Sequence, residues 1–446
     1  MGGTTKKGAS VGTGHTRPHM TETPLNRLAV LGVLAGIGTG LLVAALNRVI
    51  VTTERLVYGV DHLKALDPGS QVTPLRLAIT LVVVGIITSW SWYLLNRFGR
   101  PAVSVPGTMN GTPMPLWETL CSVFLQVISV AAGAPVGREN APRVAGGLSA
   151  SWIATTFKLD PQARSILIAS AAGAGLAASF HLPLAGALFA LELLLVEMTT
   201  RAVVTTMLTS AIAVAVTSIF IEPHPIFSTV ELNETPAMLG AALIVGIIAG
   251  MLGHWFGIVA RKAVAARPRG AAILWQMPLA FTVVAVISYL VPGVSANGRW
   301  AADTIFTTGL PVATLLLFVV LRMGIVIMCF RVGTVGGNLT PAFSLGATTG
   351  AIIGIALAGL FPSLSLSAFA IMGAGAFLST TMAAPMFGMI AAIEFTDMPA
   401  QGYLPMFVAV VGAALAVRLW GIITNKNQRI QPFTSAAWTG EAEVKP

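Results

Sequence analysis

Long apolar runs constrain this chain more than any other feature of its sequence. About 20 consecutive apolar residues cross the hydrocarbon core of a bilayer as one helix. Four runs reach that length: residues 28–51, 75–95, 238–259 and 310–330. Other apolar segments, such as residues 166–178 and 368–378, are short or interrupted by glycine. At membrane depth such segments must be buried in protein or line a wet cavity, so we expect half-spanning helices beside spanning ones.

The composition excludes an ordinary water-soluble fold. Only 10% of the 446 residues are charged, whereas a soluble domain has about 25% and needs them to cover its surface. The chain also has 46 glycines and 26 prolines. In membranes glycine lets helices approach closely. Glycine and proline can also break a helix where neighbouring groups form hydrogen bonds with the freed backbone. We therefore expect an all-α, polytopic membrane protein.

The polar ends of the chain predict short tails around one membrane domain. Residues 1–26 are rich in Gly, Ser and Thr, and we interpret them as a disordered cytoplasmic tail. We expect residues 27–436 to form a single membrane domain and residues 437–446 a short C-terminal tail. The net charge of +9 is scattered over loops and tails. This agrees with the positive-inside rule for a protein of the cell membrane and does not indicate a nucleic-acid partner.

The two halves of the sequence repeat a pattern of Pro, Gly and Glu. The segment from Pro183 to Glu192 matches the segment from Pro385 to Glu394, with a glycine at the same place. Upstream, residues 137–142 match residues 336–341 at Gly and Pro. Because the matches keep their order, we expect a duplicated fold with halves near residues 27–222 and 237–436. Transporters commonly use inverted halves, with the substrate site at their interface near the midplane.

Three glycine-containing loops lead through proline into apolar helices. They are residues 111–115, 137–142 and 336–341. Proline suits the first turn of a helix, and a helix N-terminus offers free N–H groups and the positive end of its dipole. Such an end binds anions. Several converging ends would hold a dehydrated halide without a full positive charge, so that it can leave again. The alternative is that these loops are helix breaks that serve packing only.

Glu139 is the most informative single residue. A carboxylate in a membrane segment is costly and indicates a functional site. At a helix N-terminus suited to anions, the carboxylate can occupy the anion position itself, and protonation would release it. Glu139 is thus a candidate proton-sensitive gate, and the alternative is an ion pair with Arg138 or Arg143.

The three loops resemble the signature stretches of the CLC chloride channel and transporter family. That family has stretches of the form Gly-Ser-Gly-Ile-Pro, Gly-Lys/Arg-Glu-Gly-Pro and Gly-x-Phe-x-Pro. Residues 111–115, 137–139 and 337–341 are similar to them in that order, and the likeness covers about residues 28–436. The resemblance implies a homodimer with one anion pathway in each subunit. It also implies about 17 to 18 tilted or half-spanning helices in two inverted-topology repeats.

The resemblance also implies roles for individual residues. Glu139 takes the place of the external gating glutamate, and Thr112 takes the place of the hydroxyl that binds the anion. Thr434 stands where the family has an anion-binding tyrosine. The other implied anion-site residues, through their backbone, are Asn338, Leu339, Gly137, Arg138 and Asn140. The chain departs from the family pattern at Asn140, since its proline follows one residue later than usual.

The position after Glu192 bears on proton coupling. Exchangers of the family often have a second acidic residue there that accepts protons from the inside, and this chain has Leu193. We expect chloride/proton antiport, and Leu193 motivates the alternative of passive chloride conduction. Glu197 is a weaker proton candidate, because it lies on a different helical face from Glu192; an interfacial charge near Arg201 explains it better. For Glu192 and Glu394 we expect structural hydrogen-bonding or ion-pair roles.

Other function classes fit less well. An intramembrane enzyme needs a nucleophile with a base, or paired metal carboxylates; we find neither in a plausible placement and expect no metal and no cofactor. A cation-coupled transporter would line its path with acidic residues, whereas Glu139 has Arg138 and Arg143 beside it. A fluoride- or nitrate-selective relative stays open. Thr112 favours chloride, because the resemblance implies a methionine at that place in fluoride-selective members.

Overall fold

The structure is a computed structural model that describes residues 22–59, 72–223, 225–230, 232 and 234–424. Within them the chain forms sixteen α-helices, close to the number expected, and one π-helical segment, η2, that continues α7. The elements of the first half are α1 (Leu25–Tyr58), α2 (Pro74–Phe98), α3 (Val105–Met109), α4 (Leu116–Ala131), α5 (Asn140–Thr156), α6 (Pro161–Phe180), α7 (Pro183–Leu188), η2 (Phe189–Leu195) and α8 (Thr200–Ser218).

The second half repeats this order of long and short helices. Its elements are α9 (Pro236–Ala265), η3 (Gly270–Ala272), α10 (Ile273–Leu290), α11 (Arg299–Thr307), α12 (Val312–Arg331), α13 (Leu339–Ala356), α14 (Leu366–Met382), α15 (Pro385–Phe395), η4 (Ala400–Gly402) and α16 (Tyr403–Ile423).

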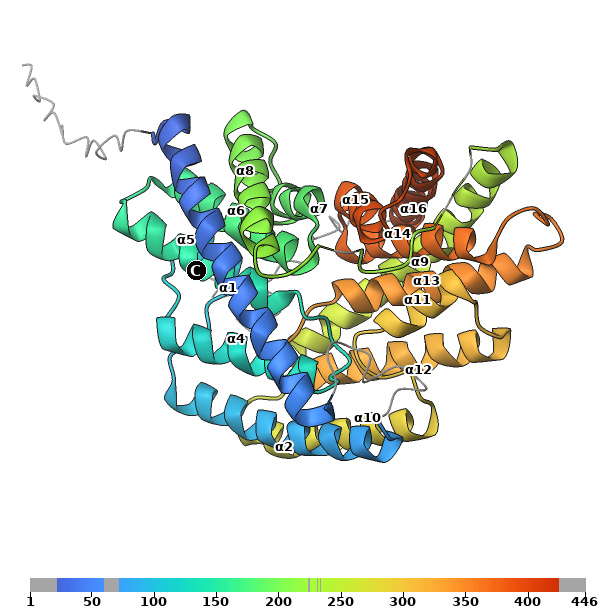
Figure 1. The fold of residues 1–446 in the computed structure, drawn as a ribbon, viewed down its shortest axis with the longest axis horizontal. Helices are drawn as coiled ribbons and strands as arrows, with labels where there is room; N and C mark the ends of the chain where they lie inside the picture. Colours follow the sequence, from blue (N-terminus) through green and yellow to red (C-terminus); the bar gives the residue numbers. More distant parts are fainter. Residues whose placement is uncertain (1–21, 60–71, 224, 231, 233, 425–446) are drawn as a thin grey trace, which may run out of the picture.

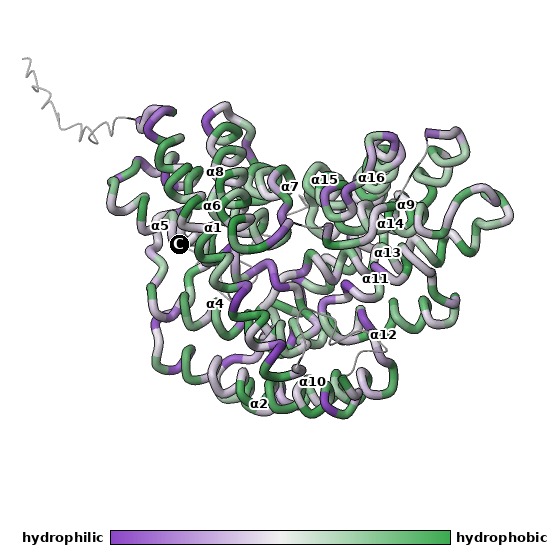
Figure 2. The backbone as a smooth tube through the Cα atoms, in the orientation of Figure 1, coloured by the Kyte–Doolittle hydropathy of each residue, from purple (hydrophilic) through white to green (hydrophobic). Residues whose placement is uncertain are grey.

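Nine of the described helices are long and apolar enough to cross a membrane. The four long runs of the sequence became α1, α2, α9 and α12. The segment predicted to be short near residue 166 is longer than expected, because α6 starts at Pro161 and is 20 residues long. Figure 2 shows apolar residues along most of the helices and polar residues mainly at their ends. The fold is that of an integral membrane protein.

The two halves are related by an approximate two-fold axis. Figure 1 shows most of α1–α8 on one side and most of α9–α16 on the other, and α2 packs against α10 across the halves. Gly137 and Gly337, which lie one residue from equivalent positions of the repeat, exchange two backbone hydrogen bonds of 2.8 and 2.7 Å in an antiparallel bridge. Antiparallel pairing of matching loops is the contact that an approximate two-fold axis produces. The halves are therefore inverted relative to each other, as predicted.

A second reciprocal contact confirms the axis. The Glu192 carboxylate accepts the N–H groups of Met386 and Phe387 at the start of α15, at 3.2 and 2.7 Å. In the other direction, Glu394 accepts the N–H groups of Leu184 and Ala185 at the start of α7, at 3.0 and 2.8 Å. Each half thus caps a helix of the other half, which is the structural hydrogen bonding that the sequence predicted for both glutamates.

Close helix contacts build the interior. α6 and α13 are the most buried of the nine long helices. Gly146 of α5 lies so close to α6 that an added Cβ would collide with the carbonyl group of Ala171. In the second half Gly346 of α13 has the same relation to the carbonyl group of Gly373 in α14. Small residues at helix contacts are typical of membrane helix packing.

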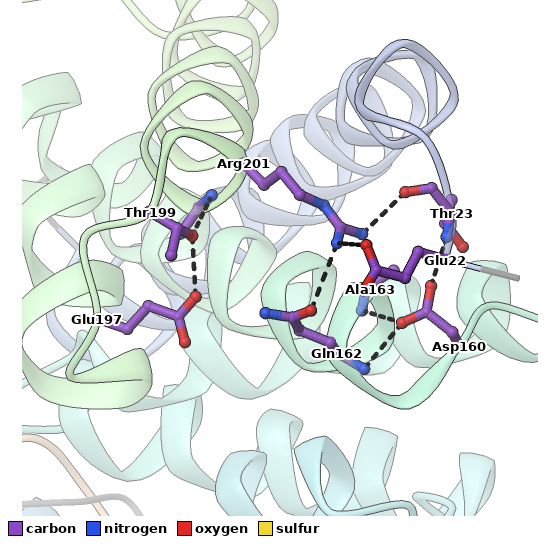
Figure 3. A network of polar contacts seen from close by, with 9 residues as sticks. Glu22, Thr23, Asp160, Gln162, Ala163, Glu197, Thr199 and Arg201 are labelled. Atoms are coloured by element: carbon purple, nitrogen blue, oxygen red, sulfur yellow. Dashed lines mark hydrogen bonds and ion pairs between the residues drawn. The ribbon is translucent and has the colours of Figure 1, made fainter. Parts of the chain in front are cut away.

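A polar network joins the starts of three helices of the first half (Figure 3). The backbone N–H of Thr23, just before α1, donates to Asp160 at the start of α6, at 2.8 Å. Arg201 at the start of α8 donates to the Thr23 carbonyl group, at 2.8 Å. α1, α6 and α8 therefore begin on the same side of the molecule. α1 starts at Leu25, inside the range predicted as tail; residues 1–21 and 437–446 of the predicted tails lie outside the described residues.

Candidate anion site

Glu139 lies at the bridge between the two halves. It occupies the turn between α4 and α5, directly before the first residue of α5, and its side chain is fully buried. Its Oε1 accepts a hydrogen bond of 2.7 Å from the backbone N–H of Leu339, the first residue of α13. The carboxylate thus occupies the N-terminus of a helix from the opposite half, where an anion is stabilised by free N–H groups and the helix dipole.

Two glycines make room for this carboxylate. An added Cβ at Gly137 would collide with the Glu139 carboxylate oxygens, and one at Gly337 would collide with Oε1 and the carboxyl carbon. The two loops are therefore shaped around the side chain of Glu139. This contact explains why each of the two loops has a glycine at this point.

Two cavities approach Glu139. The first, which we call the wide cavity, has a volume of about 360 Å³ and is lined by the polar side chains of Ser104, Thr119, Ser122, Gln126 and Asn140 among others. The second, the narrow cavity, has a volume of about 40 Å³ and includes Arg138, Asn47 and His181 in its wall. Glu139 lines neither cavity, but its neighbour Asn140 faces the wide one and its neighbour Arg138 the narrow one.

The two cavities lie on opposite sides of the molecule. The narrow cavity is lined by Ser179 and His181 at the end of α6 and by the second half of α1, both of which run away from the Thr23 network. α2 runs the other way, since Leu77 and Leu81 near its start lie close to Tyr58 at the end of α1, around Gly133. The wide cavity is at the end of α2. A side chain between two such cavities is placed to separate them.

The charges of both cavities are positive. The wide cavity is lined by Arg97, Arg267 and Arg269 and the narrow one by Arg138 and Arg299, and among the described residues no acidic one lines either. Burial lowers the pKa of Arg267, in the loop after α9, to about 10, so it stays charged at neutral pH. Walls of one sign concentrate ions of the opposite sign. Both mouths therefore attract anions, and neither suits a cation path.

The structure does not support the prediction for Thr112. Thr112 is exposed in the loop between α3 and α4 and lines neither cavity. Ser104 lines the wide cavity instead, as do Thr119 and Ser122: it is 1% exposed and lies directly before α3, where its oxygen accepts the Gly107 N–H at 3.0 Å. A serine two residues before Pro106 is a helix-start signal. The sequence interpretation missed it because it aligned the later Gly-Thr-Pro with the helix start.

Of the other residues predicted to bind the anion, Asn338 and Leu339 lie at the start of α13 and Arg138 packs against Phe180. Asn338 precedes α13 and is 2% exposed; within the described part of the chain its side-chain atoms have no hydrogen-bond partner. Leu339 contributes the N–H that Glu139 occupies. Arg138 lies with its guanidinium 4.8 Å from the centre of the Phe180 ring and donates to the Ser179 carbonyl group. Thr434 lies outside the described residues.

The predicted proton positions are apart from this site. Leu193 in η2 is fully buried. Glu192 beside it is engaged by the start of α15. Glu197 lies past the end of η2 and accepts the hydroxyl of Thr199, whose side chain caps α8. Arg201 forms its 3.7 Å ion pair with Glu22. Glu197 is thus part of the polar edge drawn in Figure 3.

The fold and the site define a polytopic membrane protein of two inverted halves, whose helix ends meet at a buried carboxylate between two basic cavities. The chain belongs to the voltage gated chloride channel family, whose sequence pattern matches residues 84–418. The H(+)/Cl(-) exchange transporter ClcA of Citrobacter koseri is 30% identical over 421 residues, which are 90% of this chain and 87% of the relative. ClcA of Yersinia pestis is 28% identical, over 90% of this chain and 86% of the relative.

Solved structures agree in fold. A slow cyanobacterial Cl-/H+ antiporter matches with a TM-score of 0.75 and 23% identity, over 92% of this chain and all of that structure's chain. A CLC-type fluoride/proton antiporter matches with a TM-score of 0.65 and 19% identity, over 88% of this chain and 96% of its own. At these identities the likeness shows the fold alone. Both structures, like the ClcA relatives, are transporters by name.

Proposed function

We propose that this protein exchanges chloride for protons across a membrane, with Glu139 as the gate. The observation that carries the proposal is the 2.7 Å hydrogen bond from the Leu339 N–H to a carboxylate that is fully buried between two basic cavities. The names of the ClcA relatives support proton-coupled chloride exchange as the activity.

The mechanism follows from the two protonation states of one side chain. The ionised carboxylate holds the N-terminus of α13 and excludes other anions. The protonated carboxyl group loses its attraction to the helix end and leaves its place between Gly137 and Gly337. An anion then binds the free N–H of Leu339, with the Ser104 hydroxyl as a polar group of the wide cavity. Protonation removes the charge of the carboxylate, and the anion takes the place that the side chain leaves. Because one side chain responds to both ions, their movements are linked.

Reconstitution into liposomes tests the proposal. We expect chloride efflux down its gradient to drive proton uptake when no pH gradient is imposed. We also expect the chloride flux to rise as the pH falls. Glu139→Gln mimics the protonated form, so it should give chloride flux that no longer depends on pH and carries no protons. Chloride flux that keeps the pH dependence of the wild-type protein in Glu139→Gln would reject Glu139 as the gate.

Passive chloride conduction is the second candidate function. Leu193, fully buried in η2, has no group that takes a proton, and Glu192 beside it is engaged by backbone N–H groups. The same liposome assay separates the candidates. Chloride flux without proton movement in the wild-type protein would establish conduction. Proton uptake that survives Glu197→Gln would show that protons reach Glu139 without Glu197.

The transported anion is proposed to be chloride. The argument from Thr112 no longer applies, because that side chain is exposed outside both cavities. The dipolar ligands of the site favour a weakly hydrated halide over fluoride, whose hydration shell costs more to remove. Competition of fluoride and nitrate with chloride efflux measures this preference. Faster flux of fluoride than of chloride would assign the protein to fluoride transport.

We also propose how the protein is arranged in the cell. The side on which α1, α6 and α8 begin carries Arg27, Lys158, Arg164 and Arg201. The positive-inside rule makes this the cytoplasmic side of the cell membrane. Residues 27–436 then form one membrane domain of two repeated halves, and the active species is a homodimer in the bilayer. Accessibility of an introduced cysteine near residue 158 tests the orientation, and mass measurement in lipid nanodiscs tests the dimer.

An enzymatic role is not part of the proposal. In the described part of the chain, no three His, Cys, Asp or Glu side chains lie together as a metal site would require.

A further inference from the structure

Arg143 is a buried cation in the first turn of α5. Its side chain is 4% exposed, and in the described part of the chain it forms no ion pair. Its Nε also has no hydrogen-bond partner there. An unpaired charge that is removed from water strongly destabilises a folded protein unless an opposite charge lies nearby. The position of Arg143 therefore requires an explanation.

A chain of buried polar side chains holds the Arg143 guanidinium in place. It donates to Asn140 Oδ1 at 2.7 Å and lies 4.9 Å from the centre of the Phe189 ring. Asn140 Nδ2 donates to Gln126 Oε1 at 2.7 Å, and Gln126 Nε2 donates to the hydroxyl of Ser122 at 3.2 Å. An arginine only donates, so it fixes the orientation of the Asn140 amide and, through it, of Gln126. Three members of this chain line the wide cavity.

The negative charge closest to this cation along α5 is Glu139. The Arg143 backbone N–H approaches the Glu139 carbonyl group, so the two residues are one turn apart, and the guanidinium interacts electrostatically with the Glu139 carboxylate. Other charged or titratable groups act on the side of the narrow cavity. Arg138 interacts with Glu139 as well, and with Glu54 of α1 and Arg299 of α11, and His181 lies in the same cavity wall. Arg143 instead is bonded to Asn140, which lines the wide cavity together with Arg97, Arg267 and Arg269.

We propose that Arg143 is a positioning residue whose fixed charge requires one anion at the start of α5, either the Glu139 carboxylate or the transported ion. This inference rests on the proposed gating role of Glu139. While Glu139 is ionised, its negative charge balances the positive charge of the buried Arg143 guanidinium. Once Glu139 is protonated the charge stands alone, and a chloride ion that enters from the wide cavity restores the balance. The charge thus links protonation of the gate to occupation of the site.

A role in packing alone makes different predictions. Arg143 stacks on Phe189, which itself packs edge-on against Phe387 with 5.5 Å between ring centres. If the residue served only this contact, Arg143→Met would lower thermal stability and leave the pH dependence of transport unchanged. Arg143→Lys, which keeps the charge and loses the planar group, would behave no better than methionine.

The test compares chloride flux against pH for the wild-type protein, Arg143→Met and Arg143→Lys. Without the guanidinium the ionised form of Glu139 is less stable, so it is protonated more readily. The pH of half-maximal flux should move upward by about one unit or more in Arg143→Met and stay within about half a unit in Arg143→Lys. Arg76→Met, an equal change at an exposed position of α2, is the matched control and should leave the midpoint unchanged.

Chloride binding provides the second measurement. In the Glu139→Gln background, where no carboxylate competes, calorimetric titration of the purified protein with chloride should show about tenfold weaker binding after Arg143→Met. If Arg143→Met does not fold, Asn140→Ala replaces it, because this change frees the guanidinium from its polar chain; the midpoint should then move in the same direction by a smaller amount.

The outcomes separate the inference from the function on which it rests. An unchanged pH midpoint and an unchanged chloride affinity in folded Arg143→Met, or in Asn140→Ala where that protein is used, overturn the role of Arg143. If Glu139→Gln has meanwhile lost its pH dependence, the gating function stands without it. If Glu139→Gln keeps the wild-type pH dependence, the proposed function itself fails.

Discussion

The start of α5 and the start of α13 are equivalent positions of one repeat, and they differ in charge. The α5 end has Glu139 before the helix and Arg143 in its first turn, joined by Asn140 to a polar chain. The α13 end has Asn338, Leu339 and Thr340, all uncharged and at most 2% exposed. The first half supplies the group that moves, and the second half supplies the helix end that receives it.

This difference explains what a duplicated scaffold contributes to transport. The two-fold axis brings two helix N-termini together at the Gly137–Gly337 bridge. If both ends carried a carboxylate, the like charges would repel at close range, and if neither did, nothing would close the site. One charged end and one receptive end make a gate.

Alanine at either bridge glycine should open the gate. The added Cβ of Gly337→Ala would overlap the Glu139 carboxylate, and that of Gly137→Ala would do the same from the other half. Because both changes expel the same side chain, we expect both proteins to show high chloride flux at neutral and alkaline pH. The flux should be about tenfold above that of the wild-type protein, since expulsion by more than about 1.4 kcal/mol shifts the equilibrium by that factor. Liposome efflux at several pH values measures it.

Gly324→Ala is the control for both glycine changes. Gly324 lies in α12, where an added Cβ would meet nothing within 4 Å. Its chloride flux should match that of the wild-type protein at every pH. A closed, pH-dependent gate in both Gly137→Ala and Gly337→Ala would show that the carboxylate does not need the space between the two loops.

Asn338→Asp should make the two helix ends alike and block the site. The substitution keeps the shape of the side chain but places a second carboxylate beside the Leu339 N–H. The new charge repels both Glu139 and chloride, so we expect chloride to bind about tenfold more weakly. Titration calorimetry in the Glu139→Gln background isolates the effect on chloride. Asn338→Leu, which removes the polar atoms without adding charge, should weaken binding less; equal losses in the two proteins would contradict the electrostatic explanation.

The sequence predicted the parts of this comparison that local chemistry determines. Long apolar runs and the spacing of Pro, Gly and Glu were enough for the helical membrane fold and the repeat, whereas the inverted sense of the repeat was expected through the resemblance. A lone carboxylate in an apolar stretch was enough to select Glu139, because burying a charge in a membrane is costly and such residues usually have a function. The partner of Glu139, the Leu339 N–H, is 200 positions away along the chain and was expected only through the resemblance.

The sequence placed Thr112 wrongly and did not reveal the polar chain of Arg143, and both have a physical cause. Thr112 and Ser104 both precede prolines and both have a hydroxyl, and only the tertiary packing of the five-residue helix α3 decides which one faces the cavity. The polar chain from Arg143 to Ser122 joins two helices through side chains. No periodicity in either helix reveals it, since Arg143 on its own looks like a partner for Glu139.

The reciprocal helix caps should respond equally in the two halves. Glu192→Ala leaves two N–H groups at the start of α15 without a carboxylate, and Glu394→Ala leaves two at the start of α7. Each loss should cost about 1–3 kcal/mol, since the acceptor is charged and the site is half-buried. Thermal unfolding in detergent should show similar decreases for both variants, with partial recovery in the Gln variants. A large loss in one half and none in the other would contradict the symmetry of this contact.

The starts of α6 and α14 also differ in charge, because one cap is a carboxylate and the other is a neutral hydroxyl. Asp160 accepts the N–H groups of Gln162 and Ala163 at 3.1 Å each, whereas Ser365 accepts the Ala368 N–H at 3.2 Å. Burial acts to raise the pKa of Asp160, but the hydrogen bonds from Thr23 and Ala163 hold it below its usual value.

A carboxylate with a lowered pKa stabilises the folded state above the pKa of the unfolded chain, about 3.9, and this contribution is lost as the pH falls below that value. Asp160→Ala should therefore lower stability at pH 7 by about 1 kcal/mol and by less at pH 3. Ser365→Ala should cost about 0.5 kcal/mol at both pH values, because a hydroxyl does not titrate. Thermal unfolding at the two pH values measures the difference. An Asp160→Ala effect that is the same at pH 3 and pH 7 would show that the charge contributes nothing, and that α6 and α14 are capped alike.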